Sequence, residues 1–297
     1  MTFKDKFEKY LNIINAELDK LFVCDDLPEK SVYDAAKYSL SAGGKRIRPV
    51  LTLAFCDMLS GALEDAAVLG SAIECIHTYS LIHDDLPCMD DDDLRRGMPT
   101  CHKAFGEATA VLAGDALLNF SFEHMSDINN FKDITAENLL KVINYIGTCS
   151  GISGMIGGQA VDMALENSIN NDVSILKYLD EKKTGALIRC SSVAGVYCAG
   201  GTEEDVKAAE NFSNYLGLAF QIKDDILDCT GTEEMLGKNI GSDKENSKTT
   251  YVSLLGIEKA EELLKEYTKK AKDALLIYGE RADFLNGLAD YLLNRNN

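Results

Sequence analysis

Apolar residues recur three and four positions apart along most of this chain, which is the spacing of amphipathic α-helices. The first example runs from Thr2, a residue type favoured at helix N-caps, to Phe22, with its apolar side chains in one stripe. Few stretches alternate as strands do, and no proline follows Pro99. The pattern therefore predicts an all-α protein.

Helices are expected at residues 2–22, 30–42, 49–59, 62–85, 105–128, 135–156 and 172–199, from 202 through 228, and in two or three shorter pieces before the C-terminus. Glycine pairs are expected to end three of them, at Gly43-Gly44, Gly157-Gly158 and Gly200-Gly201. Residues 229–248 are polar and predict a loop. Without linkers, repeats or low-complexity segments, residues 1–297 are expected to form one domain.

The predicted helix 62–85 is apolar on most faces, as expected of a central, buried helix. It leads into a cluster of aspartates, followed directly by Arg95 and Arg96. The aspartates are Asp84, Asp85, Asp90, Asp91, Asp92 and Asp93. Carboxylates at the end of a buried helix are costly unless a cation compensates them. Mg²⁺ binds carboxylate and phosphate oxygens, and guanidinium groups match phosphate, so the stretch predicts a metal and diphosphate site.

Pro87 ends or kinks this helix, so Asp84 and Asp90 are not related by helical spacing. If both bind metal, the bend must bring them together. A solvated acidic loop is the simpler alternative. A calcium loop of the EF-hand type fails, because Arg95 and Cys101 stand where that motif needs glycine and glutamate.

A second acidic motif, with Asp224, Asp225 and Asp228, favours the metal interpretation. Asp224 and Asp228 are four residues apart and lie on one helical face, where like charges repel. An apolar stretch precedes them, as it does the first motif. Two such clusters facing one cavity would form a multi-metal site for a diphosphate.

Basic residues follow breaks in the helical pattern. Lys45, Arg46 and Arg48 lie between a glycine pair and Pro49, near a helix N-terminus that favours anions. Lys183-Thr184-Gly185 falls inside the predicted helix 172–199, where glycine costs about 1 kcal/mol relative to alanine. A glycine there indicates close approach of a ligand or helix. Lys238 and Lys248 lie in the polar loop, and any of these could instead be surface residues.

Composition limits the binding partners and the cellular location that can be expected of this protein. The net charge of −18 argues against nucleic acid or an anionic membrane surface as a partner. None of the nine cysteines forms a CxxC motif, and most lie in apolar helical runs, namely Cys56, Cys75, Cys149, Cys190 and Cys198. They are expected to be reduced core residues of a cytoplasmic protein. The N-terminus has no signal-peptide core, and no apolar run is expected to reach the length of a membrane span.

Five stretches together resemble the trans-isoprenyl diphosphate synthases, and most of all the bacterial farnesyl diphosphate synthases. They are GGKRIRP at 43–49, the acidic stretch with its flanks at 76–118, GGQAVD at 157–162, KTGALIR at 183–189 and GLAFQIKDDILD at 217–228. The resemblance implies a single-domain isoprenoid synthase fold, all-α, with helices around a deep central cavity, and a homodimer. It also implies condensation of isopentenyl diphosphate with an allylic diphosphate.

By the same resemblance, Asp84 and Asp90 would bind two Mg²⁺ ions with support from Asp85, and Asp224 a third, with Asp225 and Asp228 close by. The allylic diphosphate would be held by Arg95, Lys183, Thr184, Gln221 and Lys238. The diphosphate of isopentenyl diphosphate would be held by Lys45, Arg48, His77 and Arg96.

Product length is expected to depend on the residues one turn below Asp84. Tyr79 and Ser80 lie five and four residues before it, about 5.4 Å deeper in a helix. Tyr79 would form a floor, unless it is simply a core residue, and in the family an aromatic residue there accompanies a C15 product. Farnesyl diphosphate is therefore expected, with C10 and C20 products left open.

Three rival functions remain at this stage. His83-Asp84 suggests an HD-type metal phosphohydrolase, for which His77, His102 and His124 would have to supply further ligands. A class I terpene cyclase shares metal-assisted ionisation but has no need of a second diphosphate site. A non-catalytic subunit of a heteromeric synthase would not require both acidic motifs.

Overall fold

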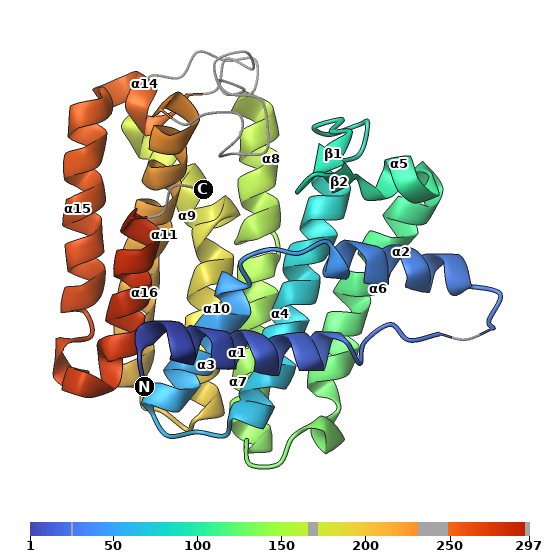
Figure 1. Ribbon diagram of the computed structural model, residues 1–297, viewed down its shortest axis with the longest axis horizontal. Helices are drawn as coiled ribbons and strands as arrows, with labels where there is room; N and C mark the ends of the chain where they lie inside the picture. The colour runs from blue at the N-terminus through green and yellow to red at the C-terminus, as the bar shows by residue number, and fades with distance from the viewer. Residues whose placement is uncertain (25, 166–171, 231–248, 295–297) are drawn as a thin grey trace. The chain divides into compact units, whose positions relative to one another are not determined.

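The computed structural model (Figure 1) describes residues 1–24, 26–165, 172–230 and 249–294. It divides into two compact units, one of residues 1–143 with 198–200, and one of residues 144–197 with 201–297. Helices dominate both units, and the strands within the described ranges form one short hairpin, β1 (Leu94–Arg95) with β2 (Met98–Pro99). The all-α prediction is confirmed. The single-domain expectation stays a prediction.

The first unit is built around α4 (Leu63–Asp84). Its other helices are α1 (Phe3–Leu18), α2 (Lys30–Ser41), α3 (Ile47–Met58), α5 (Cys101–Phe105), α6 (Glu107–Ser126) and the 3₁₀ turn η1 (Ile128–Asn130), followed by the start of α7 (Ala136–Ser150). Helices α1, α2, α3 and α6 all pack against α4, and Figure 1 shows α1 lying across α3 and α4. Nearly every position of α4 from Asp65 to Ile82 is buried, which confirms the predicted central helix.

Helix α1 begins as predicted and ends earlier than predicted. Thr2 and Asp5 form a reciprocal capping box at its N-terminus. At the end of the helix, the Lys37 ammonium binds the carbonyls of Leu18, Asp19 and Leu21 and so holds the chain in a turn after Leu18. The predicted end at Phe22 was therefore wrong.

Asp65 fastens the segment before α7 to the first turn of α4. Its side chain is buried, with 1% of the residue exposed, and accepts the backbone N–H groups of Lys132, Asp133 and Ile134 at 2.8–2.9 Å. The carboxylate also lies at a helix N-terminus, where negative charge is favoured. One buried carboxylate thus satisfies three donors far away in sequence.

The second unit is built around α11 (Glu203–Thr230). The remaining helices are α8 (Met155–Leu165), α9 (Val173–Lys183), α10 (Gly185–Cys198), α14 (Tyr251–Leu255), α15 (Ile257–Asp273), η2 (Leu276–Ala282) and α16 (Asp283–Asn294). Helices α9, α14, α15 and α16 pack against α11. Thr202 caps α11 as predicted, by accepting the Asp205 N–H.

Two predicted helix boundaries in this unit were wrong. The helix expected to reach residue 156 ends at Ser150, and Gly157-Gly158 lies inside α8 instead of breaking it. The helix expected over 172–199 is two helices joined at Thr184. Gly158 serves packing: a Cβ there would lie 2.4 Å from the Lys183 backbone nitrogen. The loop predicted at 229–248 lies, from residue 231 on, outside the described residues.

All nine cysteines are described, and all are free thiols. Those expected in the core are buried, namely Cys56, Cys75, Cys149, Cys190 and Cys198. In length and composition, residues 136–165 could cross a membrane, contrary to the expectation that no apolar run would reach that length. This is weak support for a span, because core helices of soluble proteins also meet that criterion, and α7 ends before α8 begins.

Replacing Asp65 with alanine is expected to lower the free energy of unfolding by about 3 kcal/mol, because three N–H groups, that of Ile134 fully buried, would lose their acceptor. Chemical denaturation of purified protein measures this. Glu64→Ala is the matched control, since Glu64 is an exposed carboxylate in the same helical turn and should change stability by about 0.5 kcal/mol or less. Equal stability of the two variants would show that the Asp65 contacts contribute little.

Candidate active site

The first acidic motif begins where α4 ends. Asp84 is the last residue of α4, and the Asp90 N–H donates to the Asp84 carbonyl at 2.8 Å. The chain after Pro87 therefore folds back and places Asp90 beside Asp84, as the sequence required. Their carboxylates sit at a helix C-terminus, where the helix dipole disfavours negative charge and a bound cation would be stabilising.

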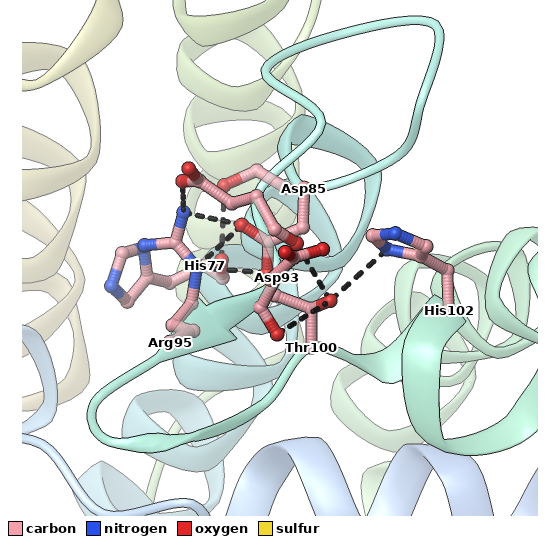
Figure 2. Close-up of polar contacts among 8 residues, drawn as sticks. His77, Asp85, Asp93, Arg95, Thr100 and His102 are labelled. Atoms are coloured by element: carbon pink, nitrogen blue, oxygen red, sulfur yellow. Dashed lines mark hydrogen bonds and ion pairs between the residues drawn. The ribbon is translucent and has the colours of Figure 1, made fainter.

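Asp85 is held inside the protein by Arg95. The Asp85 residue is 2% exposed, and the Arg95 Nε donates to both of its carboxylate oxygens at 2.7 and 2.8 Å (Figure 2). Burial raises the pKa of Asp85, and Arg95 opposes that rise. Arg95 also approaches Asp92 at 3.7 Å. Asp85 thus orients Arg95 at the edge of the acidic loop of residues 85–93, and its supporting role in metal binding stays a prediction.

A tight hairpin presents Arg96. Arg95 pairs with Met98, and the two turn residues Arg96 and Gly97 both have positive φ, as in a type I′ turn. Figure 2 shows Thr100 between His102 and the acidic loop, with the Thr100 hydroxyl donating to the Asp92 carbonyl at 2.8 Å. The hairpin is therefore fastened at its base.

The hairpin meets the glycine loop before α3. Arg96 donates from Nη1 to the Gly43 carbonyl, and a Cβ on Gly44 would lie 2.6 Å from that nitrogen. Lys45 is exposed and Arg48 is half-buried in the same loop and the first turn of α3. The structure therefore brings Arg96 to the loop that carries Lys45 and Arg48.

His77 lies on α4, two turns before Asp84. Burial, together with the positive charges of Arg48, Arg96, Arg95 and Arg46, holds the pKa of His77 well below its ordinary value. The imidazole is therefore neutral at pH 7 and can donate one N–H to an anion. These arginines, His77 and the neighbouring Lys45 form the cationic cluster of the first unit.

In the second acidic motif, as in the first, one aspartate is buried and hydrogen-bonded within the protein. Asp225 is buried, accepts the Tyr251 backbone N–H at 2.8 Å and accepts from Gln221 Nε2 at 3.2 Å. It anchors the start of α14 to α11. Asp224 is half-buried, and Asp228 is buried with an Oδ1 that has no hydrogen-bond partner among the described residues. A cation would compensate that oxygen.

Lys183 lies where α8 and α9 come closest. Its ammonium pairs with Asp162 at 2.5 Å, and Thr184 follows at the junction of α9 and α10. Close helix approach, expected from Gly185, is confirmed: a Cβ on Gly217 would lie 3.2 Å from the Gly185 Cα. The predicted position of Lys183 inside one long helix was wrong. Lys238 and Lys248 lie outside the described residues.

Sequence reasoning missed Asp180, which is buried one turn before Lys183. Its pKa is raised to about 8, chiefly by burial and also by the Asp225 and Asp162 carboxylates, while the Tyr251 hydroxyl and Lys183 oppose the rise. No spacing pattern singles out this residue, since its role depends on helices that only folding brings together. The sequence offered only the three-residue spacing between Asp180 and Lys183, which is too common in helices to identify a functional residue.

Tyr79 is a core residue beside the first motif. It is 5% exposed, and its ring meets His83 edge-on at 5.7 Å between centroids. Burial raises the pKa of Tyr79 to about 12, with Asp84 adding to the effect. Its buried hydroxyl has no hydrogen-bond partner in the described part of the chain. Ser80 is half-buried and donates to the His77 carbonyl at 2.9 Å.

A divalent metal fits the donors that these motifs offer. Within the described ranges, no three His, Cys, Asp or Glu side chains form a ready-made metal site. Mg²⁺ does not require one, because it is usually bound by one or two carboxylates together with water and substrate phosphates. Neighbouring Asp84 and Asp90, and the uncompensated oxygen of Asp228, suit that mode of binding.

The histidines do not support a phosphohydrolase of the HD type. The His83 ring contacts the Val111 carbonyl, His102 contacts Thr100, and His124 stacks on Phe120. None of them belongs to a metal-ligand group in the described ranges. The cationic cluster instead suits a protein that binds diphosphate.

Comparison with known proteins agrees with this site. The polyprenyl synthetase family matches residues 29–277. The chain is 43% identical to farnesyl diphosphate synthase of Bacillus subtilis, over 99% of this chain and 96% of that protein. It is also 43% identical to geranylgeranyl diphosphate synthase of Cyanophora paradoxa, over 90% and 88%.

Solved structures agree as well. The crystal structure of an FPP/GFPP synthase from Zymomonas mobilis superposes with a TM-score of 0.87 and 36% identity, covering 98% of each chain. Fold, site and relatives together define a trans-prenyl diphosphate synthase, an enzyme class that uses divalent metal ions. The chain belongs to the polyprenyl synthetase family.

Removing the Arg95 side chain is expected to destabilise the first unit. Arg95→Ala should lower the free energy of unfolding by about 2 kcal/mol, because the buried Asp85 carboxylate would lose its charged partner. Urea denaturation in EDTA measures this without metal effects. Lys103→Ala removes the exposed pair with Asp93 at the same hairpin and should cost about 0.5 kcal/mol or less. Similar losses in both variants would contradict the buried pairing.

Proposed function

We propose that this enzyme joins isopentenyl diphosphate head-to-tail to dimethylallyl and geranyl diphosphates and releases farnesyl diphosphate. Mg²⁺, held by Asp84 and Asp90 in the first unit and by Asp224 and Asp228 in the second, would neutralise the departing diphosphate and so ease C–O cleavage. Three such ions are expected from the family resemblance. The proposal extends the established class to a particular metal and product.

The chain's own cations would bind and orient the two diphosphates. The allylic diphosphate is assigned to Arg95, Lys183, Thr184, Gln221 and Lys238. Isopentenyl diphosphate is assigned to the cationic cluster, which includes Lys45, Arg48, His77 and Arg96. Support comes from the position of His77 among the charges of Arg48 and Arg96, and from the contact of Arg96 with the glycine loop.

The reaction requires an allylic carbocation that water must not trap, so apolar surroundings are essential. The double bond of isopentenyl diphosphate attacks C1 of that cation, and a proton then leaves. The departing diphosphate is the proposed proton acceptor, as the family resemblance suggests, since no side chain of the motifs is an evident base.

The observation that carries the C15 assignment is Tyr79. This bulky, buried side chain lies five residues before Asp84, about one helical turn below it. Its hydroxyl has no hydrogen-bond partner among the described residues. The smaller Ser80 leaves room above it. A growing chain would therefore stop after one further isoprene unit.

A C20 product is the second candidate. The chain is 43% identical both to the Bacillus subtilis farnesyl synthase and to the Cyanophora paradoxa geranylgeranyl synthase, so overall similarity does not favour either product. A terpene cyclase is a weaker candidate, because it would leave Lys45, Arg48 and Arg96 without a second diphosphate to bind. A non-catalytic subunit would have no need to keep both acidic motifs.

A homodimer is proposed from the resemblance to the family alone. A cytoplasmic location remains our proposal from the free cysteines.

The function is tested by incubating the purified enzyme with isopentenyl and geranyl diphosphates, with Mg²⁺ or with EDTA, and sizing the dephosphorylated products. The expected result is a C15 alcohol that forms only with Mg²⁺. A C20 alcohol would retain the enzyme class and overturn the assigned product. A cyclic hydrocarbon, or no consumption of isopentenyl diphosphate, would overturn the proposed reaction.

Tyr79→Ser should shift the main product from C15 to C20 or longer, because removing the ring deepens the space below Asp84 by about one turn, or about 5.4 Å. Product sizing by chromatography measures this. Ser80→Ala is the control, since it leaves the Tyr79 ring in place and should retain the C15 product. An unchanged distribution in Tyr79→Ser would remove Tyr79 as the determinant of length.

A further inference from the structure

Arg46 is a buried arginine in a cluster whose other cations are half-buried or exposed. It is 8% exposed, and its Nη1 donates to Glu74 Oε1 at 2.7 Å, while Nη2 donates to the Leu40 carbonyl. Glu74 is 2% exposed. A guanidinium buried in this way cannot reach substrate, so the contribution of Arg46 must be made through other residues.

The backbone of Arg46 is unusual too. It is the N-cap of α3, with φ of 49°, in the left-handed region that disfavours residues with a Cβ. Gly43 and Gly44 before it also have positive φ. The loop is therefore held in a shape that requires an external restraint, and the Arg46 side chain supplies one.

The ion pair joins the elements that carry the cationic cluster. Arg46 lies between Lys45 and Arg48 in sequence, and Glu74 lies three residues before His77 on the same face of α4. The hairpin arrives at the same loop, where Arg96 donates to the Gly43 carbonyl. One buried contact thus relates the backbone of the loop to the helix that carries His77.

Glu74 also opposes repulsion among the cations. The pKa of Arg96 is lowered by burial and by Arg46 and Arg95, and is raised by Glu74. Glu74 therefore offsets positive charge in the cluster when no diphosphate is bound. Stability alone does not account for the pair, because a buried ion pair can often be replaced by apolar residues without loss of stability.

We propose that Arg46 and Glu74 are positioning residues that hold Lys45, Arg48 and His77 in one arrangement for the diphosphate of isopentenyl diphosphate. Neither touches the substrate. The inference rests on the proposed function, because it assumes that this cluster binds the non-allylic substrate. By this proposal, the preference of the cationic cluster for isopentenyl diphosphate depends on the buried Arg46–Glu74 ion pair.

The experiment uses the full-length enzyme with the double substitution Arg46→Met and Glu74→Met, which replaces the ion pair with apolar side chains of similar length. The melting temperature should stay within a few degrees of the unmodified enzyme. The KM for isopentenyl diphosphate should rise about tenfold or more, while the KM for geranyl diphosphate should change less than about twofold. Arg46→Lys should recover part of the lost affinity by keeping the charge.

Asp65→Ala is the control for general loss of stability, since it weakens the other end of α4 and should leave both KM values unchanged. If the double variant does not fold, Glu74→Gln takes its place and should raise the KM for isopentenyl diphosphate several-fold. A folded variant with an unchanged KM, or with both KM values raised equally, overturns the positioning role. If the unmodified enzyme does not consume isopentenyl diphosphate, the proposed function itself fails.

Discussion

The burial of α4 is the constraint on which the first unit depends. A helix buried on nearly all sides excludes water from its ends as well, so other side chains must satisfy them. In the first turn, the buried Asp65 carboxylate is satisfied by three N–H groups of the segment before α7, and it thereby holds that segment against α4. At the other end, carboxylates add to a negative helix terminus, and Arg95 on Asp85 compensates part of that charge. The acidic loop and hairpin that follow are shaped by that compensation.

In each acidic motif, the two adjacent aspartates, Asp84-Asp85 and Asp224-Asp225, differ in burial in the same way. The second aspartate of each pair is buried and bonded within its own unit, Asp85 to Arg95 and Asp225 to Gln221 and the Tyr251 N–H. The first aspartates, Asp84 and Asp224, are half-buried. The buried member holds a neighbouring segment in place, which leaves the first member as the better candidate for metal. Two adjacent carboxylates therefore differ in role because only one of them faces the protein interior.

Overall similarity does not decide the product of this enzyme. The farnesyl diphosphate synthase of Bacillus subtilis and the geranylgeranyl diphosphate synthase of Cyanophora paradoxa are each 43% identical to this chain. The proposed determinant of product length is instead local, because it is the single buried ring of Tyr79, about one helical turn below Asp84.

The sequence by itself determined the helical class, the central position of α4 and the residue types of both acidic motifs, because these follow from short-range periodicity and from the cost of buried charge. It did not determine where helices stop: Lys37 holds the turn after α1, and the chain breaks at Thr184, through contacts that sequence spacing does not report. It also did not reveal that Arg46 pairs with Glu74, 28 positions away, or that Asp180 lies close to Asp225. Those pairings depend on which helices pack together, and only the tertiary structure decides that.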